Sequence, residues 1–436
     1  MTKTRLCGLL IIVFSLVAQT SLAQSSVTVF KGAHLIPISG EPIDNGVLII
    51  ENDKILAVGD ASLEIPSGAT VIDVSGKVIM PGLVDTHSHI GEGDGGDRSS
   101  SLHPDVRIMD AIDPRSDTFK KALAGGITAA NVMPGSGHLM SGQTVYLKLR
   151  KANTIEEMLL YIDEEETIYG GLKMANGTNP IGNAAPPRPG TRAKSAAMVR
   201  ELFIKAQNYQ KKIAEADGDE SKMPPRDLQM ETLVEVLEGK RTVHNHSHRH
   251  DDILTTIRLS QEFGYKLVLQ HVSEAYKVAE EIAEAGVPAS IITLDSFGGK
   301  LEASEFSNVN AAALEDAGVL VGFHTDDYIT DSRLFLRSAA MGAKEGMSRE
   351  KALEAVTIAN AIMMDIDHRA GSLDPGKDAD FIILSGDPLS VYTLVEETWI
   401  EGSRVWDRDN PEDLKYATGG YEIFRGTTYH HHIEGH

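Results

Sequence analysis

The chain has 436 residues, of which 42% are hydrophobic and 24% charged, and its formal net charge is −22. This length allows one large domain of barrel size and a smaller one, and the composition is that of a globular protein with an ample core. The acidic balance argues against a nucleic-acid partner and against an anionic membrane surface.

The first 23 residues are predicted to be a signal peptide. Lys3 and Arg5 form a positive start, Leu9–Phe14 opens an apolar stretch, and Ser21–Ala23 supplies small residues at the expected cleavage site. The apolar stretch is too short for a membrane anchor, so none is expected in the mature chain. Cys7 is the only cysteine and lies in this segment, so the mature chain would hold no disulfide and no thiolate ligand. We expect an exported protein, periplasmic or secreted.

Both ends of the mature chain carry strand patterns. Residues 24–80 contain short apolar runs divided by Gly, Pro, Asn and Asp, and similar runs return at Asp380–Leu384 and Thr398–Trp406. The simplest arrangement is one small β-sandwich built from residues 24–80 and 366–413, with the rest inserted as a second domain. Residues 414–436 are predicted to be a non-catalytic tail.

The middle of the chain, residues 81–365, alternates strand-like and helix-like stretches, which favours parallel βα units. Predicted strands are Ile127–Met133, Thr144–Leu149, Thr242–His246, Lys266–His271, Ala289–Leu294 and Val319–His324. Predicted helices are Ser116–Ala124, Ile155–Glu165, Ala193–Ala214, Leu228–Leu237, Ile253–Phe263, Ala275–Ala285 and Asp331–Ala343. About eight strands in roughly 300 residues fit an α/β fold of the (β/α)8 TIM-barrel type, although a doubly wound sheet alternates in the same way. Loop-like insertions at 179–192 and 217–226 are expected to shape the substrate pocket.

Ligand-type residues end four of these strands. His87 and His89 follow an apolar run, and residues i and i+2 of a strand share a face. The other three are the histidine-rich run His244–His250, His271, and the sequence His324–Asp327. The carboxyl ends of barrel strands meet at one face, and several histidines with one carboxylate match a catalytic zinc site.

Each of these features has an ordinary alternative when it is taken alone. His271 fits a satisfied histidine at the edge of the core, and the run His244–His250 fits a solvated polar turn. The two aspartates that close His324–Asp327 fit the N-cap of a following helix. Chance explains their conjunction poorly, because every one of them terminates a hydrophobic strand.

With these motifs the chain resembles the amidohydrolase superfamily, close to its imidazolonepropionase-like and prolidase-like branches. The resemblance runs from about residue 28 to 408 and rests on Pro81–His89, His246–Ile253, His271, His324–Asp327 and the late stretch Ala370–Phe381. It implies a distorted (β/α)8 barrel with a β-sandwich made from both chain ends, in agreement with the strand and helix pattern.

The resemblance also implies five metal ligands, which are His87, His89, His246, His271 and Asp326. The choice of His246 over His244, His248 or His250 depends on the alignment of Asp251–Ile253. The family's last-strand aspartate also takes the proton from the metal-bound water, so Asp326 is the expected general base. The expected cofactor is one or two zinc ions, with other divalent metals as alternatives.

Binuclear members of the family bridge their metals with a carboxylated lysine or a glutamate. Lys173 is the candidate for that lysine, with Lys148 behind it, and an ordinary solvated lysine is the alternative. Relatives carry Gly-Glu-Asn-Pro just after this lysine, whereas here the stretch is Gly177–Pro180 with threonine in place of glutamate. A glutamate ligand is therefore missing at that point.

Three further histidines, His138, His248 and His324, are expected to contact the substrate or to stabilise a developing oxyanion, with structural polar roles as the alternative. The sequence thus predicts a metal-dependent hydrolase that cleaves a C–N bond in an amide, a small peptide or an N-acyl amino acid. The alternatives are a cyclic-amide hydrolase that opens an imidazolone- or lactam-type ring, and a non-catalytic metal-binding relative. The expected partner is a small amide or peptide, and self-association is left open.

Overall fold

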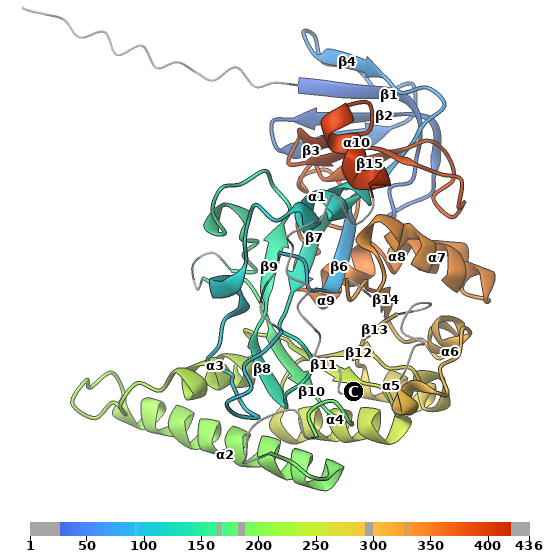
Figure 1. The fold of residues 1–436 in the computed structure, drawn as a ribbon. Helices are drawn as coiled ribbons and strands as arrows, with labels where there is room; N and C mark the ends of the chain where they lie inside the picture. The colour runs from blue at the N-terminus through green and yellow to red at the C-terminus, as the bar shows by residue number, and fades with distance from the viewer. Residues whose placement is uncertain are drawn as a thin grey trace, which may run out of the picture.

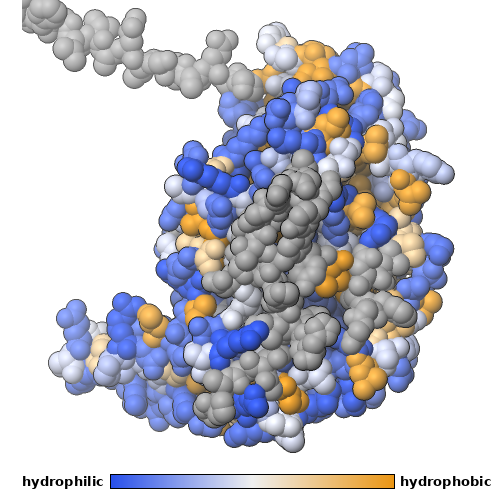
Figure 2. Space-filling view, in the orientation of Figure 1, coloured by the Kyte–Doolittle hydropathy of each residue, from blue (hydrophilic) through white to orange (hydrophobic). Residues whose placement is uncertain are grey.

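The computed structural model describes residues 27–91, 93, 95–163, 165, 167–181, 188–292, 300–327 and 329–419. The predicted signal peptide lies outside the described residues, as do most of the predicted tail, the middle of the 179–192 loop and the end of the strand predicted at Ala289–Leu294. Among the helices that are described, none combines the length and the apolar character needed to cross a membrane. The surface seen in Figure 2 is mostly hydrophilic, with hydrophobic residues scattered among polar ones.

Both ends of the chain contribute strands to one eight-stranded sheet, drawn at the top of Figure 1. Its pairing order is β17-β16-β15-β5-β1-β2-β3, with β4 paired to β1. The strands are β1 (Val27–Leu35), β2 (Ile43–Glu51), β3 (Lys54–Gly59), β4 (Thr70–Asp73), β5 (Val78–Pro81), β15 (Phe381–Leu384), β16 (Val395–Ile400) and β17 (Ser403–Asp407). The strands from the two ends of the chain form one continuous hydrogen-bonded order. We call it the end sheet.

The end sheet is held by apolar packing between segments from opposite ends of the sequence. Phe30 of β1 meets Phe381 of β15 with ring centroids 5.0 Å apart, and Trp399 of β16 stacks on Phe381. Aromatic pairs of this kind stabilise a core beyond the area that they bury. Strand β5 pairs with β1 on one side and with β15 on the other, and only Gly82 separates it from the next strand.

Two smaller sheets carry the predicted site residues. One has the order β14-β13-β12-β11-β10-β8, with β10 to β14 parallel, and the other has the order β6-β7-β9. Their strands are β6 (Leu83–Ser88), β7 (Ile127–Val132), β8 (Met140–Gln143), β9 (Val145–Lys148), β10 (Leu172–Ala175), β11 (Val243–Ser247), β12 (Leu267–His271), β13 (Ala289–Ile291) and β14 (Val321–Phe323). Every residue in these strands is buried, as expected for parallel sheets that are covered on both faces.

The two smaller sheets are joined at both margins. Thr144 alone separates β8 from β9, so one extended segment belongs to both sheets. At the other margin the backbone N–H of Asp326 donates to the carbonyl of His87 at 2.8 Å. The side chain of Asn360 donates to the carbonyls of Val84 and Phe323 and so ties β6 to β14.

Helices follow most of the parallel strands, and several begin at the residue types that favour a helix start. Thr191 accepts from the N–H of Lys194 before α2, and Asp227 does the same for Met230 at the start of α3. The α-helices are α1 (Asp117–Ala124), α2 (Arg192–Ala216), α3 (Leu228–Leu237), α4 (His250–Phe263), α5 (Ala279–Ala285), α6 (Asn310–Asp316), α7 (Phe335–Lys344), α8 (Arg349–Glu354), α9 (Ile358–Met363) and α10 (Pro411–Thr418). Short 3-10 turns are η1 (Ile108–Ala111), η2 (Glu156–Met158), η3 (Ala275–Lys277), η4 (Leu301–Ala303) and η5 (Ser332–Leu334).

Several local predictions differ from the structure. The helix predicted at Ile155–Glu165 is wrong, because this stretch forms only η2 and then pairs with the edge of β9, where the N–H of Leu160 donates to the carbonyl of Tyr146. Strand β10 is not among the predicted strands, since it is four residues long and lies between the pair Gly170–Gly171 and a turn at Gly177. The predicted tail begins inside α10, whose Tyr416 is buried.

Candidate metal centre

His87, His89 and Asp326 come together where β6 ends beside the turn after β14. The Nε2 atoms of His87 and His89 lie 3.3 and 2.9 Å from Oδ1 of Asp326. Nδ1 of His89 donates to the carbonyl of Met133 at 2.7 Å, which leaves Nε2 facing the carboxylate. Both imidazoles, from the end of β6 and the residue after it, thus face one carboxylate oxygen.

Further histidines extend this group across the neighbouring strands. A second group is formed by His246 of β11, His248 just after that strand and His271 of β12, and a third by His87, His271 and His324. In each group the ligand atoms all lie within 4.8 Å of one another. His271 is shared, with its ring centroid 4.2 Å from that of His246 and its Nε2 3.9 Å from Oδ2 of Asp326. We call these six histidines and Asp326 the metal cluster.

Backbone strain is concentrated at the same place. His271 and Asp326 have φ values of 69° and 48°, and Val272 has a φ of 38°. Such left-handed conformations are costly for residues other than glycine and persist only where the surrounding structure imposes them. The two ligand-type residues are thus held in turns that an unconstrained chain would avoid.

Burial makes the cluster histidines weak bases. Desolvation lowers the pKa of His89 to about 3 and lowers the pKa of His87, His246, His271 and His324 well below their usual value. The imidazoles are therefore neutral near pH 7, which is the form that binds metal.

The cluster also leaves buried nitrogen atoms without partners. Among the described residues, Nδ1 of His87, Nδ1 of His246, both ring nitrogens of His271 and Nε2 of His324 have no hydrogen-bond partner. Buried polar atoms are almost always hydrogen-bonded. Neutral imidazoles with unused lone pairs beside a carboxylate fit a divalent cation.

Lys173 lies within the cluster, whereas Lys148 does not. The Lys173 side chain is fully buried, and its Nζ is 2.9 Å from Nε2 of His87 and 3.0 Å from Sδ of Met133. Lys148 pairs instead with Asp378 and Asp380 next to the end sheet. Lys148 is therefore excluded as a second candidate for the bridging lysine.

The structure also separates the four histidines at β11. His246 and His248 lie in the cluster, while Nε2 of His244 is 2.8 Å from the hydroxyl of Tyr146 and His250 pairs with Glu274 at 2.7 Å.

The histidines predicted to contact substrate have different surroundings. Nδ1 of His248 is 2.8 Å from the hydroxyl of Ser273, and Nδ1 of His324 is 2.9 Å from that of Ser290. Each hydroxyl orients an imidazole whose other nitrogen faces the cluster. His138 packs against His103 with ring centroids 6.0 Å apart, and no described contact joins it to the cluster.

Three contacts of the cluster were not predicted from the sequence. Asp85 accepts from the N–H of His87 at 3.2 Å, and burial raises the pKa of its carboxyl to about 7. The Nδ2 of Asn179 lies 3.1 Å from Nε2 of His246, and the Nζ of Lys300 lies 3.4 Å from Nε2 of His248. Asp85 and Asn179 stand inside or beside the noted motifs, but no pattern in the sequence points to Lys300.

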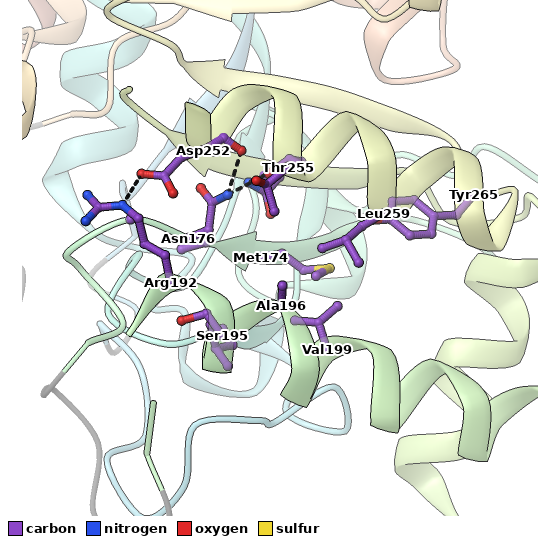
Figure 3. A pocket seen from close by; sticks show the side chains of 15 residues that line it. Met174, Asn176, Arg192, Ser195, Ala196, Val199, Asp252, Thr255, Leu259 and Tyr265 are labelled. Atoms are coloured by element: carbon purple, nitrogen blue, oxygen red, sulfur yellow. Dashed lines mark hydrogen bonds and ion pairs between the residues drawn. The ribbon is translucent and has the colours of Figure 1, made fainter. Parts of the chain in front are cut away.

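A small cavity lies behind this site, between α2 and α4 (Figure 3). Its volume is about 20 Å³, enough for a water molecule, and no cluster histidine lines it. On its polar side Arg192 donates to Asp252 at 2.8 Å, and Asn176 donates to the carbonyl of Asp252 at 2.8 Å. The cavity belongs to the packing of these helices against β10 and β11.

Comparisons with known proteins show what the chain is similar to. Residues 245–406 match the model of the amidohydrolase family. A solved amidohydrolase from Thermotoga maritima MSB8 has a TM-score of 0.81 and 34% identity, covering 87% of this chain and 100% of that one.

Two curated relatives are more distant. Amidohydrolase tasK of Hapsidospora irregularis is 25% identical over 392 residues, which is 83% of this chain but only 40% of that protein. The imidazolonepropionase of Thermoplasma acidophilum is 23% identical over 386 residues, covering 78% of this chain and 84% of that protein.

Proposed function

The chain belongs to the amidohydrolase superfamily, which confirms the resemblance found in its sequence, and on this premise we propose that it hydrolyses a C–N bond in an amide, a small peptide or an N-acyl amino acid. One observation carries the proposal. Seven buried or nearly buried ligand-type side chains from β6, β11, β12 and the β14 turn form three overlapping groups with ligand atoms within 4.8 Å.

The proposal includes the architecture that brings these strands together. The two smaller sheets would close into a (β/α)8 barrel over residues 81–365, inserted in a domain made from residues 24–80 and 366–413. Support comes from the shared β8–β9 segment and from the hydrogen bond between Asp326 and His87 at the other margin.

The metal cluster suits one or two zinc ions or other divalent cations. His87, His89 and Asp326 would hold one ion, and His246 and His271 would hold a second. When bound, such an ion supplies Lewis acidity that lowers the pKa of water to about 7 and polarises a carbonyl. Lys173 would help to hold the metal once its amine takes up CO2 as a carbamate, a step that forms an N–C bond and releases one proton.

The residues of the chain have distinct roles in this proposal. Asp326 accepts a proton from the attacking water and later delivers it to the leaving nitrogen. His324, oriented by a serine hydroxyl, would donate to the oxygen on which negative charge develops, and His248, oriented in the same way, would contact the substrate.

A second candidate is ring opening of a cyclic amide. The similarity to an imidazolonepropionase over 84% of that protein, and to dihydroorotases over shorter segments, favours it. The same residues would serve, because this reaction also adds water to a carbonyl and breaks a C–N bond.

The test is elemental analysis of the purified protein, followed by a screen of N-acyl amino acids, dipeptides and cyclic amides with and without a chelator. We expect about one or two equivalents of divalent metal and turnover that the chelator abolishes. The double variant with His87→Ala and His89→Ala should lose both the bound metal and the turnover. A protein that binds no metal, or a double variant that keeps full activity, would contradict the proposal.

A further inference from the structure

The metal cluster has two chemically different sides. On one side the carboxylate of Asp326 lies against His87 and His89 and can only accept a hydrogen bond once it is ionised. On the other side stand two donors, the ammonium of Lys300 beside His248 and the side-chain amide of Asn179 beside His246. His271 lies between the two sides.

The two donors are held in place by one set of buried contacts. Lys300 directly precedes η4, where its carbonyl accepts from the N–H of Ala303 at 3.1 Å. Within η4, the buried carboxylate of Glu302 accepts from the N–H of Thr178 at 2.8 Å and from Arg192 at 3.2 Å. Through Glu302 the segment that carries Lys300 is joined to the segment that carries Asn179, so both donors approach the cluster from connected segments.

The charge of Lys300 acts on the cluster. Burial is the largest cause of the lowered pKa of His246 and of His248, and the positive charge of Lys300 is the second largest. The chain as a whole carries a net charge of −22, and a field of that sign repels anions. A cation fixed beside the cluster offsets this repulsion at the point where an anionic group would have to sit.

We propose that Lys300, assisted by Asn179, binds a carboxylate of the substrate. The substrate would then be an acid whose scissile amide lies between this carboxylate and Asp326. N-acyl amino acids, dipeptides with a free carboxyl end and carboxylated cyclic amides all belong to this class. The inference rests on the proposed C–N hydrolysis and specifies which amides are used.

The experiment compares each acid with its neutral amide, so that only the carboxylate differs. The pairs are an N-acyl amino acid with its C-terminal amide, and a carboxylated cyclic amide with its carboxamide. For the parent we expect a preference for the acid in kcat/KM. In Lys300→Met the ratio of kcat/KM for the acid to kcat/KM for the amide should fall at least about tenfold. The change should come chiefly from a higher KM for the acid, because a charge-assisted hydrogen bond is lost. Lys300→Arg should restore most of the ratio, since it keeps the charge.

A matched control removes the same charge elsewhere. Lys205 pairs with Glu201 on the exposed face of α2, and Lys205→Met should leave the ratio unchanged. The inference is overturned if Lys300→Met keeps the parental ratio, or if the parent does not distinguish acid from amide.

A binding measurement separates this inference from the proposed function. Calorimetry of the protein as purified uses an N-alkyl amino acid, in which CH2 replaces the scissile carbonyl. We expect the parent to bind it about tenfold more tightly than Lys300→Met does. If the parent hydrolyses no amide but shows this difference in affinity, the proposed C–N hydrolysis is refuted and the role of Lys300 is not. If parent and variant bind equally well, the role of Lys300 is refuted.

Discussion

The position of Asp326 depends on the residue before it. Thr325 donates through its hydroxyl to Oδ2 of Asp85 at 2.5 Å and through its N–H to Oδ1 at 3.1 Å. The same Asp85 accepts from the N–H of His87, so one buried carboxylate fixes ligand-type residues on both β6 and the β14 turn. Because Asp326 is in a left-handed conformation, loss of this contact would let its turn relax.

Replacement of the Thr325 hydroxyl tests this contact. Thr325→Val keeps the shape of the side chain but cannot donate to Asp85, and we expect metal affinity and kcat to fall about 10- to 100-fold. Thr325→Ser restores the donor and should behave like the parent. Competition with a chelator measures affinity. Parental affinity in the valine variant would show that the hydroxyl does not position Asp326.

Buried histidines also make stability depend on pH. Burial lowers the pKa of His244 to about 3 and that of His138 to about 4, below the ordinary value of 6.5. Their contribution to the free energy of unfolding is present above pH 6.5 and is lost as the pH falls. The reason is that the unfolded chain then binds protons that the folded chain excludes. Asp85, with a pKa raised from 3.8 to about 7, acts in the opposite direction over much of this range.

As the pH falls, the two histidines lower the free energy of unfolding by more than the carboxyl of Asp85 raises it. We expect the free energy of unfolding of the metal-free protein to fall by at least about 1 kcal/mol between pH 6 and pH 5. Urea unfolding at the two pH values measures it. A free energy that is equal or higher at pH 5 would contradict this prediction.

Individual site residues differed in how well the sequence could predict them. His87 and His89 are spaced as alternate residues at the end of a strand, which places both on one face. His271 ends β12 with a φ of 69°, so its direction also depends on a strained turn that the sequence pattern does not show. Asn179 and Lys300 lie in loops, and their contacts with the cluster depend on how distant segments pack. His138 was expected at the pocket, but the segment after β7 folds back beside residues 101–103, where Met140 donates to the carbonyl of Ser101.

At the scale of single elements, the first residue of helix α2, Arg192, joins this helix to α4 and η4. Arg192 donates to Asp252 at the start of α4 and to Glu302 in η4, and both carboxylates are almost wholly buried. A single guanidinium thus joins three elements around the cavity of Figure 3. Buried carboxylates that lose their partner are costly, so α2 contributes to the shape of the site through this residue.

We expect Arg192→Met to lower the free energy of unfolding by about 1–3 kcal/mol, because two buried carboxylates lose a donor. The matched control is Arg200→Met on the same helix, where an exposed pair with Glu262 is removed and a loss below about 1 kcal/mol is expected. Urea unfolding compares them. Equal losses would show that the buried carboxylates do not depend on Arg192.

The sequence predicted long elements better than short ones. Helices α2 and α3 have a clear apolar period and a capping residue, and their predicted bounds agree closely with the structure. Strand β10 has four residues, too few for any period to show. The stretch Ile155–Glu165 has acidic helix-forming residues, but pairing with β9 overrides this preference.

For the molecule as a whole, a buried charge network joins the end sheet to the rest. Lys148 of β9 is fully buried, and its Nζ pairs with Asp378 and with Asp380 at 2.9 Å and lies 3.5 Å from Glu401. All three acids come from the last part of the chain. Asp378 and Asp380 belong to the late motif noted in the sequence, whereas Glu401 follows β16, and the aspartates of that motif thus join segments.

Lys148→Met should therefore lower the free energy of unfolding by about 3–5 kcal/mol, since several buried carboxylates lose their central cation. Lys54 also pairs with Asp378 but is partly exposed, and Lys54→Met should cost less than about 1 kcal/mol. Thermal unfolding compares them. A small effect at Lys148 would show that the acids find other partners.

The central place of β5 in the end sheet affects how the protein is made. Its neighbour β15 lies near the carboxyl end of the chain. Strand β5 is therefore synthesised well before the strand with which it pairs. Gly82 connects β5 directly to the strand with the first two histidines. A nascent chain released before residue 384 would therefore lack the anchor next to its first metal-binding motif, and premature termination there should yield protein that captures no metal.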